Sequence, residues 1–343
     1  MEMFKLLWPR WRQGGDVTIL RNEIMMVRVI LPVIIFCILG TEPPDVYASG
    51  KLVAAVLTCD ISRYRDAHRS FVKALAQRGY DQSNLDIIIQ NPNPDPISWA
   101  NSIRKFKALG ADVIITYGAP VTLAAMREVT DIPILFVDVY GPVETGISRS
   151  MTLTGSNLTG VSSKVPMTTL IRTFKEMMPL RTLGVIYSSR EVGSVVQLKE
   201  LKRIAAQQGF AVVEASATSP ATLDASLNSL VSKVDCLYVS EGSTGARNLE
   251  KIIHRATAGK IPVISQIPDA ADKGALIALE INPEEQGQMA GDYAAKILKG
   301  KNPSQMPISS PKKVELVINL RSAKLLDIAV PIQVLVGASR VIK

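Results

Sequence analysis

The chain has 343 residues, of which 47% are hydrophobic and 20% are charged. This length suits two domains of roughly 150 residues each, and the composition excludes an extensively disordered protein. The 39 lysines and arginines exceed the 31 aspartates and glutamates, but no basic block concentrates the excess, and aromatic residues make up only 5%. Neither charge nor base stacking therefore indicates nucleic-acid binding.

An apolar run, VILPVIIFCILG, occupies residues 29–40. It is short for a hydrocarbon core, which needs about 20 residues, but it has the length of a signal-peptide core. Arg28 precedes the run, and Val46 and Ala48 place small side chains at positions −3 and −1 of a cut before Ser49. We expect export to the periplasm by a cleaved signal peptide, with a retained N-terminal membrane anchor as the less favoured alternative. Residues 1–24 are foreign to a signal peptide, so Met25 or Met26 is the more natural start.

From residue 51 onward, short apolar runs alternate with amphipathic segments. Residues 52–57 are continuously apolar, as in a parallel strand that is covered on both faces. Residues 66–78 carry apolar side chains on one helical face, and Gly79 follows where a left-handed residue ends a helix. The same reasoning predicts strands at 85–89, 112–116 and 132–139 and helices at 97–109 and 121–129.

A second series follows a loop predicted over residues 140–164. Pro166 opens a helix at a favourable early position. Further strands are predicted at 182–187, 211–215, 235–239, 261–264, 275–279 and 314–319, and helices at 195–208, 221–231, 247–258, 284–298 and 321–326. This alternation predicts parallel, doubly wound α/β sheets.

The two series resemble each other, with an offset of about 130 residues, which indicates an internal duplication. The matching segments are QRGY and QQGF, ADVI and VDCL, and IPIL and IPVI, beginning at residues 77 and 207, 111 and 234, and 132 and 261. We therefore predict two doubly wound lobes joined by a hinge. The expected division is an N-terminal extension plus signal peptide (1–48), a first lobe (49–160), a second lobe (161–280), a crossover helix and strand that complete the lobes (281–326), and a C-terminal tail (327–343).

Ligands of open parallel sheets bind beyond the carboxyl ends of the strands, where helix N-termini also favour anions. In the predicted cleft the candidate ligand-binding residues are Thr58, Asp60, Tyr117, Gly118, Ala119, Thr122, Asp138, Tyr140, Tyr187, Ser188, Glu241, Ser243 and Asp269. Each has an alternative role: a hydroxyl serves equally well as a helix N-cap, a tyrosine covers a loop edge, and an acid pairs with a hinge lysine or arginine.

Signatures of catalysis are missing from the sequence. No GxGxxG after a strand, GxxxxGK[ST], GxSxG or HExxH is present. His68 and His254 fall within amphipathic helices. Cys59 and Cys236 belong to no CxxC or Cys/His cluster, so we expect no metal, no cofactor and no enzymatic activity. Two buried thiols are favoured over a disulfide, because a disulfide between Cys59 and Cys236 would link the two lobes covalently across a cleft that must open and close.

Several segments resemble the ABC transporter substrate-binding family that includes tryptophan-binding and related amino-acid-binding lipoproteins. The likeness runs from about residue 51 to about residue 326 and is carried by NLTGV, SVVQLKELK, KVDCLYV, KGAL, AAKILKG and PKKVELVINL, which begin at residues 157, 194, 233, 273, 294 and 311. The resemblance implies the type I periplasmic-binding-protein fold, a small ligand that is often an amino acid, and permease and ATPase partners at the inner membrane.

The cleft loops depart from the pattern of this family. Gly141 stands where relatives usually have the Asp of Asp-Pro-Val, Ser188 where they begin Asn-Pro, and Glu241 where they begin Thr-Asp-Asn, whereas Asp269 matches an acid of the last cleft loop. An aromatic or branched amino acid is therefore only the default expectation for the ligand.

The chain is thus expected to be a monomeric, non-catalytic solute-binding component of an ABC uptake transporter. The main alternative is a sensory module of the same fold that presents its ligand to a membrane receptor. Two further alternatives use a similar core. A sugar-repressor-like transcription factor would need a helix-turn-helix ahead of the first lobe. An enzyme on a doubly wound fold would be revealed by turnover of a candidate substrate.

Overall fold

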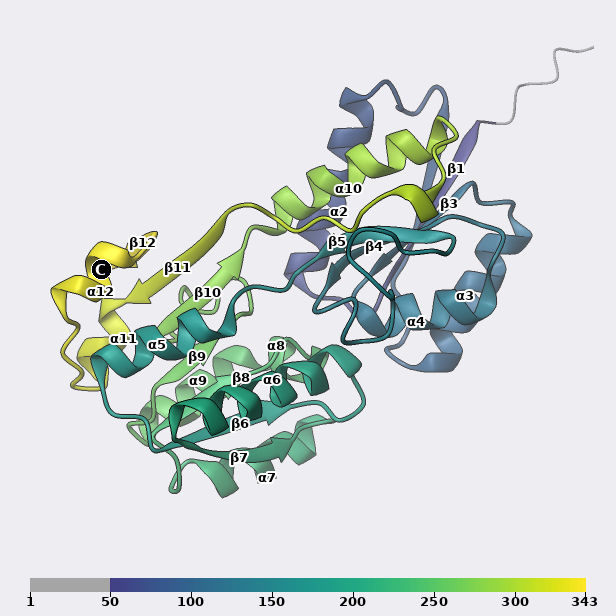
Figure 1. Ribbon diagram of the computed structural model, residues 1–343. Helices are drawn as coiled ribbons and strands as arrows, with labels where there is room; N and C mark the ends of the chain where they lie inside the picture. The colour runs from purple at the N-terminus through teal and green to yellow at the C-terminus, as the bar shows by residue number, and fades with distance from the viewer. Residues whose placement is uncertain (1–49) are drawn as a thin grey trace, which may run out of the picture. The chain divides into compact units, whose positions relative to one another are not determined.

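The computed structural model describes residues 50–343 (Figure 1). The predicted signal peptide and its cleavage site before Ser49 lie outside these residues. Within residues 50–343, no helix combines the length and the apolar character that crossing a membrane requires.

The first lobe is built on a five-stranded parallel sheet with the order β2-β1-β3-β4-β5. Alternate residues of its strand β1 belong to different hydrophobic clusters, Val53 and Ala55 to one and Ala54 and Val56 to the other. Both faces of the strand are therefore buried, as its continuous apolar run predicts. The strands are β1 (Lys51–Leu57), β2 (Leu85–Gln90), β3 (Val113–Tyr117), β4 (Ile134–Val139) and β5 (Leu158–Ser162), and the intervening helices are α2 (Ser62–Gln77), α3 (Pro96–Ala108) and α4 (Ala119–Glu128).

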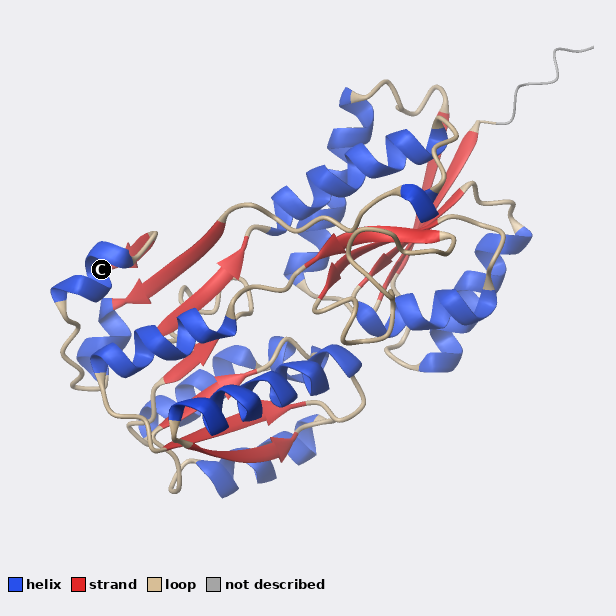
Figure 2. Ribbon diagram, in the orientation of Figure 1, coloured by secondary structure: helices blue, strands red, loops and turns tan. Residues whose placement is uncertain are grey.

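The second lobe is built on a seven-stranded sheet with the order β12-β11-β10-β9-β8-β6-β7, in which only β10 and β11 pair in antiparallel fashion. Its strands are β6 (Thr182–Tyr187), β7 (Ala211–Ser216), β8 (Cys236–Val239), β9 (Val263–Ser265), β10 (Ile277–Ile281), β11 (Val314–Asn319) and β12 (Arg340–Ile342). Its helices are α5 (Met167–Met177), α6 (Val192–Gln208), α7 (Pro220–Leu230), α8 (Ser243–Arg247), α9 (Leu249–Ala258), α11 (Leu320–Leu325) and α12 (Ile332–Gly337). Helices flank both sheets (Figure 2).

The two sheets share one topology. Counted from the first strand of each lobe, the order 2-1-3-4-5 describes both β2-β1-β3-β4-β5 and β7-β6-β8-β9-β10. The prediction of two doubly wound α/β lobes is confirmed, and the common strand order agrees with the predicted duplication. In both lobes the parallel strands direct their carboxyl ends to one edge of the sheet.

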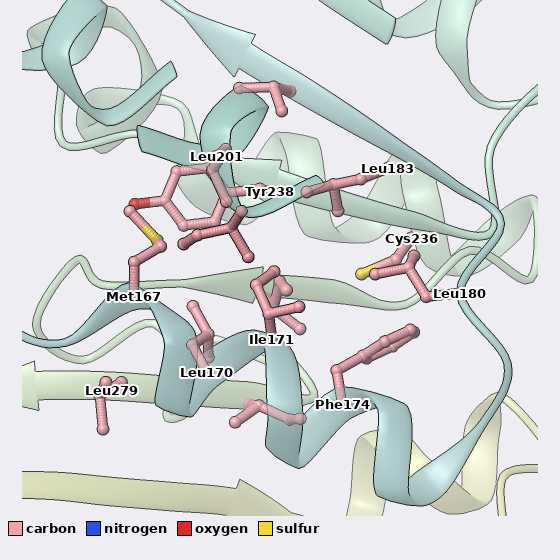
Figure 3. Close-up of a cluster of buried hydrophobic side chains, with 14 of the residues drawn as sticks. Met167, Leu170, Ile171, Phe174, Leu180, Leu183, Leu201, Cys236, Tyr238 and Leu279 are labelled. Carbon is pink, nitrogen blue, oxygen red and sulfur yellow. The ribbon is translucent and has the colours of Figure 1, made fainter. Parts of the chain in front are cut away.

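The chain passes between the lobes three times (Figure 1). After β5 it enters α5, whose Leu170, Ile171 and Phe174 pack in one core of the second lobe (Figure 3). After β10 it returns through α10 (Pro283–Leu298), which packs on α2 in the first lobe. The 3₁₀ helix η1 (Pro303–Gln305) follows, and the chain then crosses back to β11.

Three features correct the predicted elements. The predicted loop at 140–164 contains β5, in which a Cβ on Gly160 would overlap the backbone and ring of Phe136. Glycine is depleted in strands, which is why the pattern gave no strand there. The C-terminal tail contains α12 and β12, and the latter pairs with β11. The helix predicted at 247–258 corresponds to α9, and a short helix that was not predicted, α8, precedes it and ends at Arg247.

The two cysteines of the described chain are both buried and free. The preference for two buried thiols over a disulfide is therefore confirmed for Cys59 and Cys236.

Candidate functional site

A buried polar network joins the two lobes at the strand ends. Arg63, the second residue of α2, is 7% exposed, and its Nε lies 2.8 Å from Oδ2 of Asp138 at the end of β4. Its Nη2 donates to the backbone carbonyl of Glu241, which follows β8 in the second lobe, at 2.9 Å. One side chain of the first lobe thus contacts the backbone of the second.

The network extends in both directions from this contact. In the second lobe, Oε1 of Gln197 accepts from the backbone N–H of Glu241 and from the Tyr238 hydroxyl, both at 3.0 Å. The same hydroxyl lies 3.4 Å from Gln266. On the first-lobe side, Nε2 of Gln286 in α10 donates to Oδ1 of Asp138 at 3.3 Å. We call this set the interlobe network; it consists of Arg63, Asp138, Gln197, Tyr238, Glu241, Gln266 and Gln286.

Several buried polar atoms of this region have no hydrogen-bond partner within the described residues. They include Thr58 Oγ1, Arg63 Nη1, Gln197 Nε2, Gln266 Nε2 and Gln286 Oε1. Arg63 Nε and Asp138 Oδ2 also lack a well-aligned hydrogen bond, but at 2.8 Å they compensate each other as an ion pair. A buried polar group left unpaired costs about 1–3 kcal/mol, so folded proteins rarely collect several in one place. Such a collection is suited to a polar ligand.

Backbone geometry directs two of the predicted residues into this region. Asp138 has φ 57°, a left-handed conformation that is uncommon for a residue other than glycine. Gly118, with φ 94°, begins the turn into α4, and a Cβ there would lie 2.9 Å from Thr58 Oγ1 and against the Tyr64 hydroxyl. Only glycine fits this turn, which brings the first turn of α4 close to Thr58.

Electrostatic effects at the site are large because the groups are buried. Burial raises the pKa of Glu241 to about 8; Arg63 opposes this shift, and Asp138 adds to it. Burial also raises the pKa of Glu191, whose carboxyl group accepts from the backbone N–H and hydroxyl of Ser243. Glu241 therefore carries a proton for part of the time at neutral pH, while Arg63 remains charged.

Other predicted site residues surround the network or belong to the core. Ser243 is bound by Glu191, and the Ser188 backbone N–H donates to Ser194 at 2.8 Å. The Tyr140 hydroxyl donates to Glu200 at 2.9 Å. Tyr187 is half-buried at the end of β6, and Ala119 is buried at the start of α4.

Three predicted residues have structural partners within the protein, and a fourth lies at a separate cavity. The Thr122 hydroxyl bonds back to the Gly118 carbonyl at 2.8 Å, and the fully buried Tyr117 hydroxyl contacts His68 at 3.0 Å. Asp60 is exposed and ion-paired with Arg65. Asp269 is exposed with φ 62° and lines a separate cavity of about 560 Å³. The structure does not bring Asp60 or Asp269 into the interlobe network.

Sequence reasoning missed Arg63, Gln197, Tyr238, Gln266 and Gln286. Arg63 precedes the stretch where helical periodicity is visible, and the other four are uncharged. A signal was nevertheless present for Gln197, because Leu201 and Ile204 follow it at i+4 and i+7 on one helix face, and a polar residue in line with apolar ones indicates a buried polar function. Among residues 50–343, no group of three or more His, Cys, Asp or Glu side chains is arranged to hold a metal ion.

Comparison with known proteins gives consistent matches over most of the chain. The family model described as ABC transporter substrate binding protein matches residues 55–342. A tyrosine-binding protein of Clostridioides difficile (strain R20291) is 31% identical over 263 residues, which is 76% of each chain.

Solved structures with the same fold include a ligand-free, open substrate-binding protein with adhesive properties from Clostridium difficile. It is 32% identical, with a TM-score of 0.66 over 85% of this chain and 99% of that one. An ABC domain from Streptococcus pneumonia in complex with L-Trp is 24% identical, with a TM-score of 0.81 over 86% and 100%. Its identity is low enough that it shows the fold alone. Because the family model covers nearly all of the described residues, this chain belongs to the ABC transporter substrate-binding protein family, whose members bind solutes and are not enzymes.

Proposed function

We propose that this protein is the periplasmic ligand-binding subunit of an ABC uptake transporter and that it binds an amino acid between its lobes. The observation that carries the proposal is the group of unpartnered, buried polar atoms in the interlobe network. The tyrosine-binding relative supports an amino acid as the ligand.

The charges of the network suit the ammonium group of such a ligand. Asp138 and Glu241 place two carboxyl groups against a single buried cation, Arg63. The free Oε1 of Gln286 adds an acceptor beside Asp138. A cationic group on the ligand favours the ionised form of Glu241, whose pKa is raised to about 8, and with both acids ionised the three charged groups then sum to −1.

A ligand that contacts both lobes stabilises their closed arrangement. Arg63, Asp138 and Gln286 belong to the first lobe or pack on it, whereas Gln197, Glu241 and Gln266 belong to the second. Binding energy shared between the lobes shifts the population toward closure. The closed protein would then be the form that delivers its ligand to the permease.

The ligand class is tested by thermal unfolding of the purified protein with each of the twenty L-amino acids and with glucose, ribose and inositol. A ligand present at 100 times its dissociation constant adds about 2.7 kcal/mol of stability. We expect one amino acid, or a small group of related ones, to stabilise the protein, and calorimetry to give a single site. Stabilisation by a sugar and by no amino acid would contradict the proposal.

The transport role needs a separate test in cells. Deleting the gene should abolish high-affinity uptake of the radiolabelled amino acid, and the restored gene should recover it. Unchanged uptake in the deletion strain would remove the transporter assignment while leaving the ligand assignment intact.

A further inference from the structure

We propose that the carboxylate of the ligand is held jointly by Arg63 of the first lobe and Gln197 of the second. This inference rests on the proposed amino-acid-binding function and deepens it. It assigns the two side chains that recognise the anionic end, and it makes that end the bridge between the lobes.

Arg63 has one donor group to spare. Its Nε faces Asp138, and its Nη2 donates to the Glu241 carbonyl and lies 3.4 Å from the Tyr64 hydroxyl. Nη1 has no partner within the described residues, although the side chain is only 7% exposed. A guanidinium is charged at all relevant pH values and its fork matches a carboxylate. The free end of a buried guanidinium therefore selects an anionic acceptor.

Gln197 presents a second donor whose identity is fixed by its partners. The backbone N–H of Glu241 can only donate, so the amide atom that it contacts at 3.0 Å must be Oε1. Nε2 then has no well-formed hydrogen bond, although it lies close enough to the Glu241 carboxyl to lower the pKa of that group, and the Gln197 side chain is fully buried. Arg63 and Gln197 bind the carbonyl and the amide of the same residue, Glu241, so both side chains are held at one position of the second lobe.

Gln286 presents a free hydrogen-bond acceptor instead of a free donor. The Asp138 carboxylate, paired with Arg63, can only accept, so the amide atom that it contacts is Nε2 and the free atom is the acceptor Oε1. Gln266 has no fixed orientation, because the single proton of the Tyr238 hydroxyl is already directed to Gln197. Free donors at Arg63 and Gln197, and a free acceptor beside Asp138, match the carboxylate and ammonium ends of an α-amino acid.

The assignment is tested with Gln197→Glu. This substitution keeps an oxygen for the Glu241 N–H and the Tyr238 hydroxyl but replaces the free donor with an anionic oxygen. Dissociation constants are measured by calorimetry for each stabilising L-amino acid and for its carboxamide, which lacks the negative charge. For the natural protein we expect the carboxamide to bind at least about tenfold more weakly than the amino acid, as for a lost hydrogen bond to a charged group. We expect Gln197→Glu to bind the amino acid at least about tenfold more weakly than the natural protein does. Its affinity for the carboxamide should not fall.

The matched control is Gln207→Glu, which adds the same charge to an exposed position of the same helix. It should leave both dissociation constants unchanged. The role of Arg63 is tested with the neutral pair Arg63→Gln/Asp138→Asn, which avoids an unpaired buried charge. A melting curve first shows that this double variant is folded. Its dissociation constants for the amino acid and for the carboxamide should then be nearly equal.

The outcomes separate this inference from the function on which it rests. If amino acids bind but the carboxamide binds equally well, or if Gln197→Glu weakens both ligands alike, the carboxylate assignment is wrong and the amino-acid function stands. If the double variant still binds the amino acid tenfold more tightly than the carboxamide, Arg63 does not bind the ligand carboxylate. If no amino acid binds the natural protein, both the inference and the proposed function fail.

Discussion

At the scale of single residues, the position of a residue along a strand predicted whether it lies in the interlobe network. The position of a residue along a helix did not. Asp138 and Glu241 could be predicted because Asp138 lies at the end of strand β4 and Glu241 closely follows strand β8, and the ends of parallel strands meet at one edge of a sheet. Arg63 and Gln197 lie within helices, where the direction of a side chain depends on how the helix docks. That docking is a property of the packed lobes, so the sequence predicts only Asp138 and Glu241 among the seven residues of the interlobe network.

Glu280 shows how burial makes stability depend on pH outside this network. It is 7% exposed at the end of β10, and burial raises its pKa to about 7, although the Asp269 N–H and Arg340 favour its charged form. The folded protein therefore holds this proton more tightly than the unfolded chain does. The resulting stabilisation is complete below about pH 4.5 and is lost as the pH rises through about 7.

Glu280→Gln removes this titration. We expect the variant to be more stable than the natural protein at pH 8 by about 1–3 kcal/mol, with the difference shrinking toward pH 5. Urea unfolding at the two pH values measures this change. Glu176→Gln, at an exposed position of α5, is the control and should follow the natural protein at both. An equal stability difference at pH 5 and pH 8 would show that Glu280 does not titrate in this range.

At the scale of elements, periodicity located the strands and helices that are apolar on a regular face. It failed for β5, where Gly160 interrupts the strand pattern, and for β12, where three half-buried residues complete the sheet edge. The antiparallel pairing of β11 with β10 also could not be predicted from the sequence, because it results from the chain's third passage between the lobes. Local pattern predicts the elements, whereas long-range pairing decides their directions.

The crossover helix α10 depends on two glycines. A Cβ on Gly287 would lie 2.0–3.0 Å from backbone atoms of Ala67 in α2, and one on Gly291 would lie 2.5 Å from the Cβ of Ala74. Gly287 lets the α10 backbone approach the α2 backbone, and Gly291 lets it approach the side chain of Ala74. Gly287→Ala forces the two helices apart, and overpacking of this kind costs about 1–3 kcal/mol.

Urea unfolding should show this loss for Gly287→Ala. The matched control is Gly337→Ala, in the last turn of α12, where no atom lies within 4 Å of the added Cβ. Because alanine favours helix over glycine, that variant should be neutral or slightly stabilised. Similar stabilities for the two variants would mean that α10 does not pack as closely on α2 as the contacts indicate.

At the scale of the whole molecule, the lobes contact each other through groups that only closure brings together. Arg63 binds the Glu241 backbone, and Cys59, just after β1 in the first lobe, lies within hydrogen-bonding reach of Ser243 in the second. Cys59 is fully buried in this arrangement, and burial raises the pKa of its thiol. Cys236 is equally buried, but within strand β8 at the core of the second lobe.

The two thiols therefore report different motions. Separation of the lobes removes Ser243 from Cys59 without disturbing either core, whereas Cys236 reacts only when the second lobe itself opens. In the ligand-free protein we expect dithionitrobenzoate to modify Cys59 and to leave Cys236 nearly untouched. Saturation with the amino acid that stabilises the protein most should slow the Cys59 reaction at least about tenfold, because the ligand favours the closed population. Peptide mass analysis identifies the modified cysteine, and Cys59→Ser should lose the ligand-sensitive reaction. Equal rates with and without ligand would mean that binding does not close the lobes, and the bridging role of Arg63 and Gln197 would lose its consequence for transport.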